Sequence, residues 1–246
     1  MADRLCMGCM EVYEDKYDIC PYCGYKEGAP AKEAIHLAPG TVIGNKYIVG
    51  QSIGNGGFGV TYIGWDAVLN QKIAIKEYLP SEFSTRAMGV SNVTIFTGQK
   101  EEQFLSGVNK FVDEARRLAK FKGVSGIVDI HDTFQANNTA YIIMEYIDGE
   151  TLKERLEREG KIPYEEALKI MKPVVEALKE VHKEGILHRD ISPDNIMISK
   201  DGDVKIIDFG AARYATTGHS RSLSVLVKPG YAPQEQYRSR GDQGTW

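Results

Sequence analysis

The strongest constraint on the fold is a set of short polar motifs in the last third of the chain. A tripeptide at 188–190 ends in Asp190, Asn195 follows five residues later, and a second tripeptide at 208–210 begins with Asp208. Each tripeptide alone would occur by chance in many proteins. Their joint occurrence at this spacing is not a chance event, and it marks this stretch as the part of the sequence that carries chemistry.

A glycine-rich segment lies upstream, at Gly54–Gly59, in the pattern G-x-G-x-x-G. The pattern alone is weak, but here it joins two strand-like runs rather than a strand and a helix. It therefore argues against a dinucleotide-binding fold and for a loop that covers phosphates. Lys76 ends the next apolar run, at 73–76. Beside such a loop, a lysine is a candidate phosphate ligand that needs a carboxylate partner.

The candidates for that carboxylate lie on a predicted helix at 101–122, where apolar residues recur at helical spacing. Glu114 is the best candidate, and Asp113 and Glu102 are the alternatives. An ordinary surface salt bridge is the other interpretation of these side chains.

The order of the predicted elements indicates the architecture. Strand-like runs come first and helices mostly afterwards, which predicts an α+β chain with two lobes. The predicted strands fall at 47–76, 127–134 and 139–147, and the other predicted helices at 152–159 and 163–184. Two short strands are predicted after the helices, at 195–198 and 204–207. Residues 80–99 are predicted as an insertion or loop. Pro173 is expected to kink or break its helix.

Together these motifs resemble those of the eukaryotic-type protein kinase family, of the Ser/Thr class and with a bacterial character, from residue 47 to residue 246. The resemblance implies a two-lobed protein kinase-like fold, with an antiparallel β N-lobe plus a helix and a mainly α C-lobe. The expected division is a four-Cys knuckle at 1–27, a linker at 28–46, the N-lobe at 47–147 and a partial C-lobe at 148–246.

The resemblance also implies catalytic roles. Lys76, paired with Glu114, would hold the α- and β-phosphates of ATP, and Asp190 would accept the proton of the substrate hydroxyl. Asn195 and Asp208 would hold Mg²⁺ ions. The implied activity is transfer of the γ-phosphoryl group to Ser or Thr hydroxyls of protein substrates. The alternative is a nucleotide-binding but inactive interaction module, either a pseudokinase or a truncated kinase.

The nucleotide-binding residues that the resemblance implies lie in the glycine-rich loop and around the adenine base. They are Ile53, Gly54, Asn55, Gly56, Gly57, Phe58, Gly59, Thr61, Ala74, Lys76, Met144, Glu145, Ile147, Met197 and Asp208. In this set the backbone of Glu145 and Ile147 would hydrogen-bond the base.

Two positions depart from the usual Ser/Thr kinase pattern. Ser192 stands where the family usually carries Lys, and Lys228 stands where it usually carries Thr. In the family these two side chains meet near the γ-phosphate. We therefore expect the two departures to be a single exchange, in which the cation has moved from the position of Ser192 to that of Lys228, on the opposite side of the phosphate. The alternative is a pseudokinase with weakened transfer. Ser/Thr specificity then rests on 193–195 and 229–231, which resemble that branch of the family.

Arg189 predicts control by phosphorylation, because a guanidinium beside Asp190 can pair with a phosphate group. The candidate acceptors are Thr216, Thr217, Ser220, Ser222 and Ser224.

The family's C-lobe continues with further helices beyond the position of Trp246, so we expect a truncated C-lobe. The inner apolar face of the helix at 163–184 would then lose part of its cover. Each Å² of apolar surface left in water costs about 25 cal/mol of folding free energy. We therefore expect a homodimer through the truncated C-lobe. The residues of this face are Ala167, Ile170, Met171, Val174, Leu178 and Val181.

Four cysteines lie near the N-terminus as two C-x2-C pairs, Cys6 with Cys9 and Cys20 with Cys23. Two such pairs can close a tetrahedral metal site, and zinc is the favoured metal, with iron possible. Two disulfides or four free thiols are the alternatives. Because four thiolates fill the coordination sphere, we expect a structural or partner-binding role.

The composition excludes some other classes. A net charge of -4 gives no electrostatic case for nucleic acid or an acidic membrane surface. No apolar run approaches the roughly 18–20 residues of a membrane helix. All the cysteines belong to the knuckle, which fits a reducing compartment, and we expect a cytoplasmic protein.

Overall fold

The computed structural model describes residues 3–209, 213–214, 228 and 230–237. The chain forms two compact units. The first comprises Met1–Arg116 and Ile130–Tyr146, and the second comprises Arg117–Asp129 and Ile147–Trp246. The candidate phosphorylation sites between Thr216 and Ser224 lie outside the described residues.

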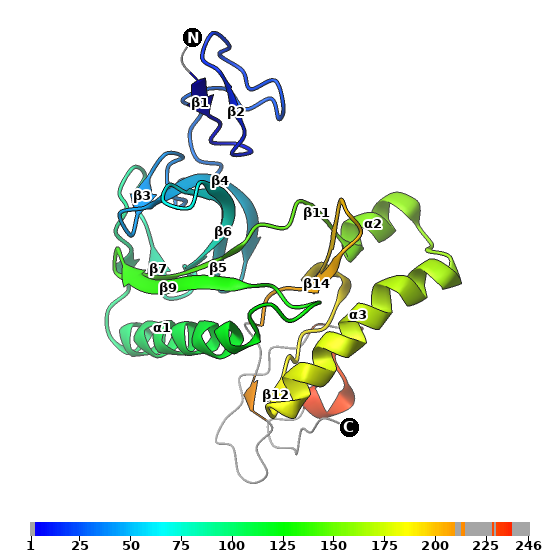
Figure 1. Cartoon of the computed structure of the whole chain (residues 1–246). Coiled ribbons are helices and arrows are strands. Elements are labelled where there is room, and N and C mark those ends of the chain that lie inside the picture. Colours follow the sequence, from blue (N-terminus) through cyan, green and yellow to red (C-terminus); the bar gives the residue numbers. More distant parts are fainter. Residues whose placement is uncertain (1–2, 210–212, 215–227, 229, 238–246) are drawn as a thin grey trace. The chain divides into compact units, whose positions relative to one another are not determined.

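The first unit is built on a curled six-stranded antiparallel sheet in the order β3-β4-β5-β6-β10-β9 (Figure 1). Its strands are β3 (Val42–Ile43), β4 (Tyr47–Gly56), β5 (Gly59–Asp66), β6 (Gln71–Tyr78), β9 (Ile130–Ala136) and β10 (Thr139–Glu145). The turn between β5 and β6 is fixed by Asp66, whose carboxylate accepts from the N–H groups of Val68 and Leu69 at 2.8 and 2.9 Å. Such local carboxylate–backbone bonds favour turns. This sheet contains the strands that the sequence predicted at 47–76, 127–134 and 139–147.

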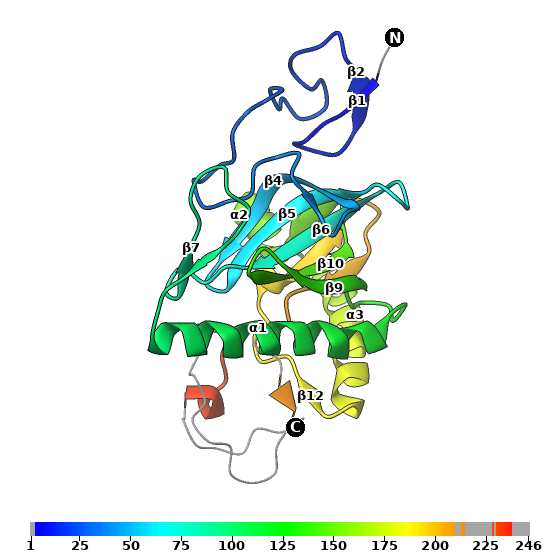
Figure 2. The same ribbon diagram turned by 90° about the vertical axis from the view of Figure 1, so that its left-hand side faces the viewer.

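Helix α1 (Gln99–Leu118) lies along the sheet beside β9 (Figure 2). Its Phe104 and Phe111 place their rings 5.2 and 5.5 Å from the ring of Tyr78 on β6. Aromatic pairs at this separation contribute packing beyond simple area burial. A 3₁₀ turn at Ala119–Phe121 follows α1, so the predicted helix at 101–122 ends less regularly than its apolar pattern indicated.

The polar segment between β6 and α1 is ordered. It contains a short hairpin of β7 (Ser84–Thr85) and β8 (Thr94–Ile95). The N–H of Val93 donates to the carbonyl of Asn137 at 2.8 Å, which ties the segment to the turn between β9 and β10.

The N-terminal knuckle pairs β1 (Asp3–Leu5) with β2 (Val12–Glu14) and packs on β4. The N–H of Gln51 donates to the carbonyl of Met7 at 2.8 Å. At Gly50, an added Cβ would lie 2.6 Å from the backbone carbonyl oxygen of Met7, so only glycine allows this approach. The knuckle is therefore packed against the sheet.

In the described part of the second unit, the α-helices are α2 (Leu152–Glu159) and α3 (Tyr164–Lys183). It also contains the sheet β11-β13-β14 and the pair β12-β15, with bounds Gly149–Thr151, Ile196–Ser199, Val204–Ile206, Ile186–Leu187 and Arg213–Tyr214. Helix α2 begins with a capping box, in which the Thr151 hydroxyl accepts from the N–H of Glu154 at 3.1 Å and the Glu154 carboxylate accepts from the N–H of Thr151 at 2.7 Å. This reciprocal pairing satisfies two backbone donors at the helix start.

Of the kink or break expected at Pro173, the break does not occur, because helix α3 continues through Pro173 as a single helix. Its buried side chains are those of Ile170, Val174, Ala177 and Val181. Met171, which the sequence pattern assigned to the inner face, is instead exposed. It belongs to a second apolar stripe, made of Tyr164, Leu168, Met171 and Val175, which are all exposed and follow one another at helical spacing.

Candidate functional site

The glycine-rich segment forms the tip of the β4–β5 hairpin. Gly56 pairs with Gly59 at its end. Gly59 has a φ of 154°, and an added Cβ there would lie 1.8 Å from the carbonyl oxygen of Glu77, so this position requires glycine. At Gly56 and Gly57 an added Cβ would meet nothing within 4 Å. The chain's own packing does not demand glycine there, which fits a loop whose backbone approaches a ligand.

One face of the sheet gathers several predicted nucleotide-binding residues. Thr61 and Ile142 are both opposite Lys76 in register, and Met144 is opposite Ala74. Residues opposite one another share a face, as do residues two apart along a strand. The sheet therefore brings Thr61, Ala74, Lys76 and Met144 to one face. Glu145 follows Met144 and is the last residue of β10.

Glu114, the predicted partner of Lys76, lies on α1 and is partly buried. Of the two alternatives, Asp113 is exposed and accepts from Arg116 at 3.3 Å, and Glu102 is exposed in the first part of the helix. The pairing of Lys76 with Glu114 stays a prediction.

The second unit holds the polar motifs in a compact loop. The ring of His188 lies 4.3 Å from that of Phe209, and its Nδ1 accepts from the N–H of Asp190 at 3.3 Å. Arg189 and Asp208 adopt positive φ values of 68° and 55°. Positive φ in a residue other than glycine is uncommon, and such conformations cluster at functional sites.

Asp190 and Asn195 are joined directly. The Asn195 amide donates to the Asp190 carboxylate and to the Asp190 backbone carbonyl, both at 2.8 Å. Burial raises the pKa of Asp190 above its ordinary value, while the Asn195 hydrogen bond and the charge of Lys228 oppose the rise. The negative charge of Asp208 also raises this pKa. A raised pKa suits a carboxylate that accepts a proton during a reaction.

Asp208 follows a strand that is bound to this loop, since the N–H of Ile207 donates to the carbonyl of Asn195 at 2.9 Å. Asp208 itself is exposed. The loop thus assembles two carboxylates and one amide, and oxygen ligands of this kind are those that Mg²⁺ prefers.

Lys228 lies beside Ser192. Its ammonium donates to the Ser192 hydroxyl at 3.1 Å and forms a close ion pair with Asp194. Lys153 of α2 also donates to Asp194, at 3.0 Å. Although partial burial opposes the effect, these two lysines lower the pKa of Asp194. The two departures from the kinase pattern are therefore neighbours, and the catalytic role of Lys228 stays a prediction.

The four knuckle cysteines converge. Their sulfurs all lie within 4.8 Å of one another, with Cys6 3.5 Å from Cys23 and Cys9 3.8 Å from Cys20. A tetrahedral site with Zn–S bonds of about 2.3 Å separates its sulfurs by about 3.8 Å, so the cluster fits such an ion. Burial raises the pKa of Cys6 to about 11, and a bound cation would favour the thiolate instead.

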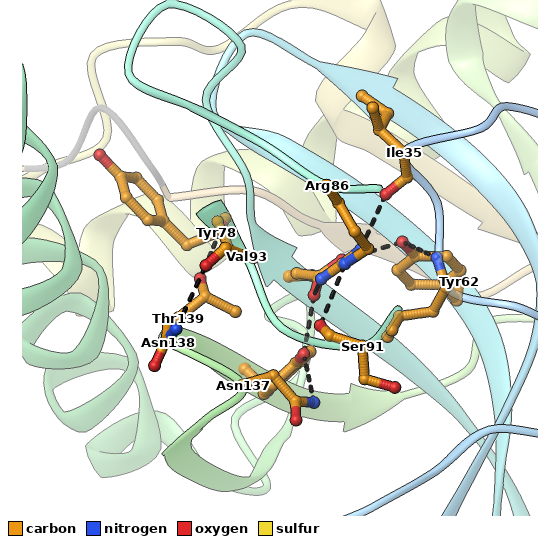
Figure 3. Close-up of polar contacts among 12 residues, drawn as sticks. Ile35, Tyr62, Tyr78, Arg86, Ser91, Val93, Asn137, Asn138 and Thr139 are labelled. Atoms are coloured by element: carbon orange, nitrogen blue, oxygen red, sulfur yellow. Dashed lines mark hydrogen bonds and ion pairs between the residues drawn. The ribbon is translucent and has the colours of Figure 1, made fainter. Parts of the chain in front are cut away.

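Sequence reasoning missed a buried ion pair behind the sheet face that carries Lys76. Glu77 and Arg86 are both fully buried, with two contacts between their charged groups. The Glu77 carboxylate also accepts from the hydroxyls of Tyr62 at 2.9 Å and Tyr141 at 2.7 Å. Figure 3 shows Arg86 reaching from the 80–98 segment toward Tyr62 and Ile35. A signal existed, because Glu77 alternates with Ile73 and Ile75 on the apolar face of its strand.

Comparison with known proteins identifies the family. The family model for the protein kinase domain matches residues 47–243. A probable serine/threonine-protein kinase of Clostridium acetobutylicum is 37% identical over 188 residues, which is 76% of this chain and 26% of that protein. The serine/threonine-protein kinase PrkC of Bacillus subtilis is 32% identical over 200 residues, 81% of this chain and 28% of that protein. The chain thus spans well under half the length of these curated relatives.

A solved structure described as PpkA-294 in its apo form has a TM-score of 0.72 and 31% identity, and the match covers 84% of this chain and 73% of that one. The predicted α+β, two-lobed kinase-like fold is therefore confirmed. Among the described residues, no helix is both long and apolar enough to span a membrane. The match to the kinase domain model covers most of the sequence, and the chain belongs to the protein kinase family.

Proposed function

We propose that this chain catalyses ATP-dependent transfer of the γ-phosphoryl group to Ser or Thr hydroxyls of protein substrates. The observation that carries the proposal is the Asp190–Asn195 pair, in which a partly buried carboxylate with a raised pKa is held at 2.8 Å by a neighbouring amide. Asp190 accepts the proton of the substrate hydroxyl, and Asn195 keeps its carboxylate oriented. The relatives' names, all of Ser/Thr kinases, support the substrate class.

The first unit provides the nucleotide-binding residues in this proposal. The backbone of Gly54–Gly59 covers the phosphates of ATP, and Lys76 holds the α- and β-phosphates. Ile53, Thr61, Ala74, Met144 and the backbone of Glu145 contact the base and sugar, together with Ile147 and Met197 of the second unit. The shared sheet face of Thr61, Lys76 and Met144 supports this assignment.

Asn195 and Asp208 are the proposed Mg²⁺ ligands, and bound Mg²⁺ would neutralise charge on the phosphate oxygens. Lys228 is proposed to replace the cation that the family usually carries at the position of Ser192. Its 3.1 Å contact with the Ser192 hydroxyl supports this.

The second candidate function is nucleotide binding without transfer, and the departures at Ser192 and Lys228 favour it. Two assays on the same preparation separate the candidates. The first measures transfer of labelled phosphate from ATP to a generic basic protein, with the Asp190→Asn variant as control. The second measures Mg²⁺-dependent binding of a fluorescent ATP analogue. Binding with transfer supports the kinase, whereas binding with no more transfer than the control supports the inactive module.

The knuckle is proposed to hold one structural zinc ion, with iron as the alternative, through Cys6, Cys9, Cys20 and Cys23. The sulfur–sulfur separations support a tetrahedral site. A thiolate-bound metal suits a reducing compartment, so we propose a cytoplasmic location. Elemental analysis of protein purified without chelator tests the site, and a preparation with neither zinc nor iron would exclude it.

The proposed organisation divides the chain into a knuckle (1–27), a linker (28–46), an N-lobe (47–147) and a C-lobe portion (148–246). We also propose a homodimer formed through the C-lobe portion. The exposed stripe on α3 supports it, because Leu168, Met171 and Val175 offer successive apolar side chains to a second copy. Analytical ultracentrifugation should show a dimer that Leu168→Glu converts to a monomer, with Lys169→Glu on the same helix as the control.

A further inference from the structure

The segment between the knuckle and the kinase sheet is bound to the strand that leads into the glycine-rich loop. We call residues 30–37 the strap. The side-chain amide of Gln51 on β4 donates to the carbonyl of Pro30 at 3.1 Å. The ammonium of Lys32 donates to the carbonyl of Ser52 at 2.8 Å. These two contacts fix the first half of the strap to consecutive residues of β4.

The strap also contacts the glycine-rich loop itself. The amide of Asn55 donates to the carboxylate of Glu33 at 3.2 Å. Asn55 lies between Gly54 and Gly56, and this whole stretch is exposed. Glycine-rich chain has more accessible conformations than any other, so a side-chain contact within it restricts the conformations that the loop can adopt.

The far end of the strap is held by the buried ion pair. Arg86 donates to the carbonyl of Ile35 at 2.8 Å, and the N–H of Leu37 donates to the Tyr62 hydroxyl at 3.1 Å (Figure 3). That hydroxyl in turn donates to Glu77 at 2.9 Å. Arg86 and Glu77 are both fully buried, so this end of the strap is fixed to the core. The contact between Glu33 and Asn55 therefore joins a segment that is bound to the core to the exposed glycine-rich loop.

We propose that Glu33 is a positioning residue for nucleotide binding, through which the strap, held by Arg86, restricts the glycine-rich loop to conformations that accept ATP. The inference rests on the proposed kinase function. It assigns a role in nucleotide binding to residues that lie outside the kinase motifs. Glu33 acts through Asn55 and does not touch the nucleotide. A strap that merely covered the edge of β4 would contribute to folding and leave the loop unaffected.

The kinetic test compares Glu33→Ala, Asn55→Ala and the double variant. Each single change removes one hydrogen bond of ordinary strength, so KM for ATP should rise about two- to fivefold while kcat changes little. Glu33→Ala also removes the 3.7 Å contact between Glu33 and His36. The double variant should therefore be no worse than Glu33→Ala, because both single changes remove the bond between Glu33 and Asn55. Glu33→Gln retains an oxygen acceptor and should keep the KM of the unmodified protein. Glu101→Ala, an exposed glutamate on α1, is the matched control.

A second measurement does not depend on transfer. Amide hydrogen exchange across 52–59 in the nucleotide-free protein should be faster in Glu33→Ala than in the unmodified chain or in Glu101→Ala. Unchanged exchange and unchanged KM would overturn the proposal, as would equal effects of Glu33→Gln and Glu33→Ala. If the unmodified chain transferred no phosphate, the kinase function would fail, while the exchange measurement would still decide whether the strap positions the loop.

Discussion

Two buried or partly buried carboxylates, one in each unit, have opposite surroundings. Glu77 of the first unit is fully buried and accepts from Arg86 and from the hydroxyls of two tyrosines. Asp190 of the second unit is partly exposed and is held by the amide of Asn195. The first carboxylate has its acceptor sites filled by protein donors. The second has a pKa that burial raises.

The difference separates a carboxylate that maintains structure from one suited to chemistry. A buried charge is tolerated when it is paired and hydrogen-bonded, and removing one partner then leaves an uncompensated charge. A proton acceptor needs the opposite arrangement, since its oxygen must remain able to bind the substrate's proton. Substitution of Glu77 or its partners should therefore change stability, whereas substitution of Asp190 should change activity.

The largest expected effect is on transfer. Asp190→Asn removes the proton acceptor and should lower kcat about 10²- to 10⁴-fold, the range typical of positioned general bases. The free energy of unfolding should stay close to that of the unmodified protein. Labelled-phosphate transfer and urea unfolding measure the two quantities, and Asp201→Asn, at an exposed turn, is the control. Full transfer by Asp190→Asn would remove this residue from the chemistry.

The matching effect on stability concerns Arg86. Arg86→Ala leaves Glu77 buried without its cation and should destabilise the protein by about 3–5 kcal/mol in urea unfolding. Arg158→Ala, which breaks exposed ion pairs on α2, should leave stability nearly unchanged.

A double variant sharpens the result. Replacing both partners, as Glu77→Leu with Arg86→Met, should recover much of the loss, because a buried pair is often replaceable by apolar side chains. If the double variant were less stable than Arg86→Ala alone, the two tyrosine hydroxyls rather than the ion pair would dominate the cluster.

A smaller effect on transfer is expected at Lys228. Lys228→Thr removes a charged hydrogen bond to Ser192 and should lower kcat about 10- to 100-fold. The double variant Lys228→Thr with Ser192→Lys has a cation at position 192, where the family usually carries one, and should recover part of the lost kcat. Labelled-phosphate transfer by the two variants tests whether Lys228 replaces the cation that the family carries at position 192. A normal kcat in Lys228→Thr would contradict this exchange of roles.

The spacing of the sequence motifs pointed to Asp190 and Asn195, and the structure joins these two side chains by a hydrogen bond. Their catalytic roles and that of Lys76, which the resemblance to the family implies, stay predictions. Glu77 lies on the apolar face of its strand, but the buried ion pair was not found because its partner Arg86 lies in a polar segment that was predicted as an insertion or loop. Nothing in the local pattern of Arg86 indicates burial. The strap was interpreted as a linker because most of its contacts involve backbone groups, which leave no periodic signal in the sequence.

The smallest expected effect is a shift in the pH dependence of transfer. Burial raises the pKa of Asp190, and the charge of Lys228 opposes that rise. Because Asp190 must be deprotonated to accept a proton, kcat/KM should fall as the pH decreases through this pKa. The acid limb should therefore lie above the ordinary aspartate value of 3.8. Lys228→Thr removes a positive charge that favours the carboxylate, so the limb should move to higher pH, while Lys228→Arg retains the charge and should leave it in place. A limb that moved equally in both variants would mean that lost packing, rather than charge, links Lys228 to Asp190.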